Sequence, residues 1–167
     1  MELQPGDHVV HQVHGPGTVI EVTTRDMPGG PREYVSLQLA TMTLLVPLDE
    51  VDDSGLRQPI DAADAHSIIE LLGKESLDDP GHRARRSRNR SRIASGEAEG
   101  LAKVVRSLKA LRQESGRPLR YADKNHLRQA LRQLVGELAL ALGIDETEAE
   151  EMVLDAVADD EPESADS

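Results

Sequence analysis

Residues 81–92 read GHRARRSRNRSR and hold six arginines but no acidic residue. Guanidinium groups at this density suit phosphate oxygens, with which arginine forms charge-assisted hydrogen bonds. The chain has a formal net charge of -12, yet residues 82–133 carry 15 of its 19 lysines and arginines and only four acids, a local charge of +11. Because binding depends on the local field, this segregation predicts a polyanionic partner.

Duplex DNA is the polyanion that this composition favours. The arginine run has no apolar face, unlike membrane-surface helices and calmodulin targets. With two tyrosines and no phenylalanine or tryptophan, the chain also lacks the aromatic platform on which single strands and many RNAs stack. Arginine contacts to phosphates, including those in a narrow minor groove, would tolerate any sequence. Three alternatives stay open: a solvated basic face, an RNA-binding module, and an adaptor whose basic domain docks on an acidic protein surface.

The remaining chemically suggestive residues do not add up to catalysis. His8, His11 and His14 are spaced for a metal site, but on a strand His11 would point away from the other two, and neither a carboxylate nor a cysteine completes the set. The HGPG sequence lacks the lysine and the spacing of a phosphate-binding loop. We therefore predict no catalytic residue, no metal and no cofactor, and a chain that is not an enzyme.

The sequence also indicates a compartment. Its first residues, MELQPGDHVV, have neither the basic nor the apolar segment of a signal peptide. No stretch approaches the roughly 18 apolar residues that span a membrane, and the chain has no cysteine. These features predict a cytoplasmic protein with no membrane association.

Residues 1–50 are predicted to form short β-strands. Two β-prone runs flank HGPG, which we interpret as a turn at Gly15 and Gly17, and MPGGPRE is a second turn. Alternation in YVSLQLA places Val35, Leu37 and Leu39 on one face, and MTLLVPL is a further strand. Short strands joined by tight turns are typical of a small SH3-like or Tudor-like β-barrel.

Everything after the acidic junction DEVDDSGLRQPIDAAD is predicted to be helical. A first helix ends at Gly73, and the arginine run ends at Gly96. The segment LAKVVRSLKALRQ has apolar residues at helical spacing and is followed by a stop at SGRP.

A longer helix then ends at Gly143, and its apolar stripe lies beside a basic stripe of Lys124, Arg128 and Arg132. Asp145 with Glu148 resembles a capping box that opens a last helix. The chain is thus predicted to be α+β, with a Tudor-like or SH3-like β-barrel domain at residues 1–58. An all-α helical domain at residues 59–158 and an acidic disordered tail at residues 159–167 complete the prediction.

Several stretches together resemble the CarD/CdnL family of bacterial RNA polymerase-binding regulators. They are PGDHVVHQVHGPGTV, REY, VPLDEV and GLR in the first half and IASGE, AKVVRSL and LVGELALA in the second. Each is weak alone, but their order over residues 1 to about 157 carries the resemblance. It implies a Tudor-like domain that binds the polymerase β subunit through an edge strand, a module also found in the transcription-repair coupling factor. It further implies a helical domain that contacts DNA at the upstream edge of the transcription bubble and favours the open complex.

Candidate binding residues follow from these interpretations. The edge strands for strand addition would be residues 18–25 and 43–46, and the resemblance places a polymerase-contacting arginine at Arg25. The candidate polymerase contacts are Thr24, Arg25, Leu45, Val46 and Pro47. The candidate DNA contacts, expected to be sequence-tolerant and made by a monomer, are His82, Arg83, Arg85, Arg86, Arg88, Arg90, Lys124 and Arg128.

Two residues depart from the family pattern. The tryptophan that the family uses as a wedge at the bubble edge falls on His82, and an imidazole offers far less apolar area for unstacking a base step. We expect this ring to gain a proton beside phosphates, which favour its charged form. Leu45 stands where a family arginine helps to hold the polymerase, so the promoter effect is expected to be weaker or different, unless the extra arginines compensate.

Overall fold

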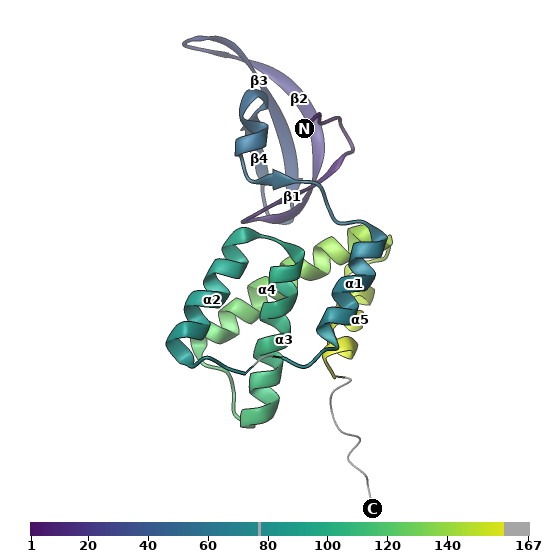
Figure 1. Ribbon diagram of the computed structural model, residues 1–167. Helices are drawn as coiled ribbons and strands as arrows, with labels where there is room; N and C mark the ends of the chain where they lie inside the picture. The colour runs from purple at the N-terminus through teal and green to yellow at the C-terminus, as the bar shows by residue number, and fades with distance from the viewer. Residues whose placement is uncertain (77, 159–167) are drawn as a thin grey trace, which may run out of the picture. The chain divides into compact units, whose positions relative to one another are not determined.

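The computed structural model describes residues 1–76 and 78–158. The chain forms two compact units, one of residues 1–59 and one that begins at Ile60. The first is built around a β-sheet and the second from helices (Figure 1), so the predicted α+β class is confirmed. The predicted acidic tail lies outside the described residues. Across the described ranges, no helix is both long enough and apolar enough to cross a membrane.

The first unit is a five-stranded antiparallel sheet in the order β4-β3-β2-β1-β5. Figure 1 shows β2 and β3 as a long curved hairpin, which extends past the short neighbouring strands. The side chains predicted to share a face, Val35, Leu37 and Leu39, are all buried. The elements are β1 (His8–His11), β2 (Gly15–Met27), β3 (Gly30–Leu39), β4 (Thr43–Pro47), the 3-10 helix η1 (Leu48–Asp53) and β5 (Leu56–Arg57).

The turn predicted at HGPG lies earlier than expected. It occupies residues 12–14, and β2 already begins at Gly15, whose φ of 79° only glycine adopts readily. Gly17 belongs to the strand, where a Cβ atom would lie 2.6 Å from the Leu39 side chain. This glycine therefore serves the close packing of β2 against β3 rather than a turn.

The second unit contains five helices around an apolar core of leucine, valine and alanine side chains. Gly96, Gly116 and Gly143 follow three of these helices with φ between 63° and 68°, which ends each helix in a left-handed residue. The backbone N–H of Glu148 donates to Asp145 Oδ1 (2.8 Å), so the cap predicted before the last helix is present. The helices are α1 (Ala62–Leu72), α2 (His82–Ser95), α3 (Ala98–Ser115), α4 (Tyr121–Leu142) and α5 (Glu146–Ala158).

The predicted stripes on α3 and α4 form the centre of this core. Leu101, Val104, Val105 and Leu108 of α3 are at most 1% exposed. One acid lies among the apolar residues of α4: Glu137 is fully buried, and its Oε1 accepts a hydrogen bond from the backbone N–H of Ile60 (3.0 Å). A buried carboxylate is stable only when it is hydrogen-bonded, so this contact fixes the start of the helical unit.

Candidate functional site

Helix α2 carries most of the arginine run, and its side chains are not equivalent. Arg83 and Arg90 are exposed, while Arg86 and Arg88 are half-buried and the Nε atom of each is buried. One side of the helix is buried and consists of Arg85, Asn89 and Ile93 at i, i+4 and i+8, so an arginine also occupies the side that faces the core. The exposed remainder presents guanidinium groups to solvent.

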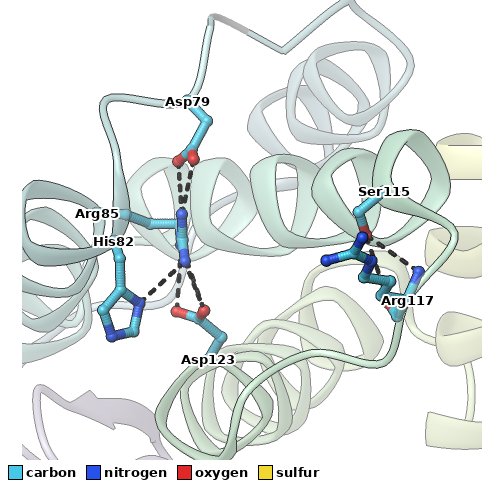
Figure 2. Close-up of polar contacts among 6 residues, drawn as sticks. All are labelled: Asp79, His82, Arg85, Ser115, Arg117 and Asp123. Atoms are coloured by element: carbon cyan, nitrogen blue, oxygen red, sulfur yellow. Dashed lines mark hydrogen bonds and ion pairs between the residues drawn. The ribbon is translucent and has the colours of Figure 1, made fainter.

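Arg85 is the centre of a buried ionic cluster (Figure 2). It is 6% exposed, and its Nη1 donates to both carboxylate oxygens of Asp79 (2.9 and 2.7 Å). Its Nε and Nη2 donate to Asp123 at the start of α4, with a shortest distance of 2.9 Å. These two carboxylates raise the pKa of Arg85 further, above its already high value, chiefly through the Asp123 hydrogen bonds.

The prediction that Arg85 contacts DNA phosphates is therefore corrected. Its donors are already committed to groups within the chain, and breaking a buried ion pair by removing one partner costs about 3–5 kcal/mol. Arg85 instead joins the first turn of α2 to the first turn of α4 and to the preceding loop. The sequence signal that could have identified it is its place on the stripe that leads to buried Ile93.

His82 lies at the first position of α2 and is partly exposed. Desolvation lowers its pKa below the ordinary value of 6.5, and Arg120, Arg86 and Arg85 lower it further, against the opposite pull of Asp123. The expected gain of a proton is thus opposed in the free protein, because neighbouring arginines already supply positive charge.

The candidate surface extends beyond the residues that sequence reasoning selected. Figure 1 shows the first turns of α2 and α4 beside each other, joined by the Arg85 to Asp123 bonds, with the end of α3 on the same side of the unit. A shallow pocket of about 520 Å³ opens at the end of α3. It is lined by Lys109, Arg112, Gln113, Gly116, Arg117 and Pro118.

A hydrogen-bonded turn shapes this pocket. Ser115 Oγ accepts from the backbone N–H of Arg117 (3.2 Å) and donates to the Arg117 carbonyl (3.4 Å), as drawn in Figure 2. Sequence reasoning did not select Lys109, Arg112 and Arg117 of this pocket. Their charge was the signal for them in the sequence, since they lie in the basic window of residues 82–133 but outside the arginine run. Lys124, Arg128 and Arg132 add the exposed basic stripe predicted on α4.

In the β unit, β4 is an edge strand of the sheet. The Leu39 N–H donates to the Met42 carbonyl (2.9 Å), and paired residues in an antiparallel ladder alternate between bonded and non-bonded pairs. Counting from that bond, the Ser36–Leu45 and Tyr34–Pro47 pairs are non-bonded, so Leu45 and Pro47 turn their backbone groups away from β3. Leu45 is 38% exposed and offers a free N–H and C=O at the edge.

Val46 does not fit the predicted contact set. The same alternation turns its backbone groups toward β3, and its side chain is 5% exposed within the core of the sheet. Thr24 and Arg25 are exposed on β2, beyond the residues of that strand that β1 pairs with. They lie on the opposite side of β3 from β4, so the structure does not bring the two groups of predicted contacts onto one edge.

The three N-terminal histidines do not converge on a ligand. His11 Nδ1 accepts backbone N–H groups of Val13 (3.1 Å) and His14 (3.2 Å), and the rings of His11 and His14 stack with centroids 4.8 Å apart. Burial lowers the pKa of His11, and His14 lowers it further. Among residues 1–76 and 78–158, no group of three histidines or acids is placed to hold a metal ion.

Comparison with known proteins matches both units. Residues 3–60 match a family described as the CarD-like/TRCF RID domain, and residues 67–154 match one described as the CarD C-terminal domain. A protein of Bacillus subtilis (strain 168), named "Putative transcription factor YdeB", is 25% identical over 147 residues. That alignment covers 86% of this chain and 95% of the relative.

Proposed function

Because this chain belongs to the CarD family of transcription regulators, we propose that it binds the RNA polymerase β subunit and promoter DNA at the same time. The β unit would hold the polymerase and the helical unit would contact DNA, and together they would alter the stability of the open complex at initiation. The observation that carries the proposal is the segregation of charge: +11 in residues 82–133 of a chain with a net charge of -12.

The open edge of β4 supports the polymerase contact. Strand addition uses free backbone groups at a sheet edge, and Leu45 offers an N–H and a C=O of this kind. The RID domain of the matched family is an RNA polymerase-interacting domain, which supports the polymerase as the partner. Arg25 and Thr24 of β2 would make a separate side-chain contact, because β3 lies between them and the β4 edge, and Pro47 would lie at the end of the added strand.

The α2 arginines that are exposed or half-buried support the DNA contact. Arg83, Arg86, Arg88 and Arg90 of α2 would neutralise phosphates, with Lys124 and Arg128 of α4 beside them. Phosphate contacts carry no sequence information, so binding would be sequence-tolerant. The protein would act as a cytoplasmic, nucleoid-associated monomer without catalytic activity or cofactor.

The test is binding of the full chain to duplex DNA over a range of salt concentrations, together with co-purification with RNA polymerase. If Arg83, Arg86, Arg88 and Arg90 together neutralise about four phosphates, log K should fall against log salt with a slope near -3.6. A slope near zero combined with retained polymerase binding would favour the rival function, a protein adaptor whose basic unit docks on an acidic protein surface.

A further inference from the structure

Arg85 also contacts the residue that occupies the family's wedge position. Its Nη2 lies 3.2 Å from His82 Nδ1, in addition to its bonds to Asp79 and Asp123 (Figure 2). A guanidinium has five N–H groups and no acceptor. The five are accounted for by two bonds to Asp79, those to Asp123 and the one to His82.

The chemistry of this contact decides where the histidine proton is. Because arginine can only donate, His82 Nδ1 must accept and cannot itself carry a proton. A neutral imidazole with an unprotonated Nδ1 carries its hydrogen on Nε2. Figure 2 shows the second ring nitrogen of His82 on the side of the ring away from Arg85, so its N–H is not used by that contact.

The other groups around His82 favour the same state. Arg120 precedes α4, and Arg86 lies one turn along α2; both oppose a positive charge on the ring, as Arg85 does, whereas Asp123 favours one. The carboxylate of Asp123 accepts three of the Arg85 contacts, so the Arg85 charge offsets the tendency of Asp123 to raise the His82 pKa. The net effect of desolvation and these charges is a lowered pKa.

We propose that Arg85 is a positioning residue that holds His82 as a neutral imidazole whose Nε2–H donates a hydrogen bond to an acceptor on promoter DNA. This inference rests on the proposed DNA contact of α2. In this proposal His82 does not unstack a base step as an apolar wedge would. It donates one directed hydrogen bond, which a small polar ring can do. The acceptor is an oxygen or nitrogen atom of a phosphate or of a base edge.

The proton position is tested without DNA, by long-range ¹H–¹⁵N NMR of the full chain at pH 7. We expect an unprotonated Nδ1 and a protonated Nε2 for His82, with a pKa below 6.5. In Arg85→Met, or in the neutral Arg85→Gln if the methionine variant does not fold, the pKa of His82 should rise and the tautomer preference should weaken. The matched control is Arg83→Met, which removes an exposed arginine of the same helix. A wild-type His82 that is charged at pH 7, or protonated on Nδ1, would contradict the proposal that Arg85 holds the ring neutral with its hydrogen on Nε2.

The DNA contact is tested separately with two isosteres. In His82→Gln the amide nitrogen reaches about as far as Nε2, whereas in His82→Asn it reaches only as far as Nδ1. On one promoter fragment with a pre-melted bubble, Gln should retain wild-type affinity, and Asn should lose about 2- to 10-fold, as for one hydrogen bond. An equal loss in both variants, or in neither, would overturn donation by Nε2.

The source of the acceptor is resolved by the DNA used. If it is a phosphate, the Asn loss should be equal on all sequences and on intact duplex. If it is a base edge, the loss should be confined to the bubble or to particular sequences. Retained salt dependence with no difference between Gln and Asn would leave the proposed DNA binding intact while removing this inference.

Discussion

The two units of this protein would bind their partners by different physical means. The β unit, residues 1–59, has three arginines and nine acids, a net charge of -6, and its candidate contact is a row of backbone groups along β4. The helical unit gathers its positive charge in α2, α3 and α4 and leaves α5 acidic. Backbone pairing requires an open strand edge whose N–H and C=O groups are in the correct register, whereas phosphate binding requires only local charge density.

Salt should separate the two modes. Surface charge pairs weaken as ionic strength rises, while backbone hydrogen bonds along an edge strand depend little on it. A substitution that weakens one binding mode should leave the other in place.

The largest effect should come from replacing Arg83, Arg86, Arg88 and Arg90 together by alanine. With about four phosphates neutralised, wild-type affinity for duplex DNA should fall about 100-fold between 50 and 200 mM salt. In the variant we expect weak binding on all sequences and a much flatter slope, measured by fluorescence anisotropy with the full chain. Polymerase binding should be unchanged. A wild-type slope retained in the variant would mean that other cations carry the contact.

The next effect should come from Leu45→Pro on the β4 edge. Proline removes the N–H that points away from β3, so the sheet's own ladder keeps its bonds while the added strand loses one. We expect at least several-fold weaker polymerase binding in a pull-down. Leu45→Ala is the matched control because it keeps the N–H and should bind more strongly than the proline variant. Equal binding by the two variants would argue against strand addition at β4.

A smaller effect is expected from Arg25→Glu. Reversing one exposed charge on β2 should weaken polymerase binding if Arg25 makes the polymerase contact that the family resemblance implies. DNA affinity and its salt slope should be unchanged, which makes this variant a control for the α2 series. A wild-type pull-down result would remove β2 from the interface.

The smallest effect concerns stability and pH. Burial lowers the pKa of His126 on α4, chiefly by desolvation, and the pKa of His82 is lowered too. The unfolded chain then binds more protons than the folded one below about pH 6.5, so the stability of the helical unit should fall as pH drops from 7.5 toward 5.5. The thermal midpoint of the helical circular dichroism signal should follow this trend. His126→Gln should reduce the dependence, and a midpoint that rises on acidification would contradict the assignment.

The helix boundaries could be predicted because local chemistry determines them. Gly96 and Gly143 end their helices in a conformation that other residues rarely adopt, and Asp145 caps α5 with its own side chain. The strands of the sheet were visible as alternation, since Val35 and Leu37 point to one side. These features depend on residues close together in the sequence.

The features that were missed depend on distant residues. Arg85 is bound by Asp123, which is 38 positions away, so the only local signal that separated it from its neighbours was its helical spacing from Ile93. Asn89 is fully buried on the same face of α2 as Arg85, although the composition of the arginine run suggested a helix exposed on all sides. The outward turn of Leu45 follows from a hydrogen-bond register that begins at Leu39, which no periodicity reveals.

Open-complex lifetime on a single promoter tests the central claim most directly, because it requires both units at once. The cognate RNA polymerase would be assayed alone, with the wild-type chain, with Leu45→Pro, and with the four-alanine α2 variant. We expect the wild-type chain to change the lifetime and both variants to return it toward that of the polymerase alone. An unchanged lifetime with the wild-type chain, or a full effect from both variants, would contradict a regulator that joins the polymerase to DNA.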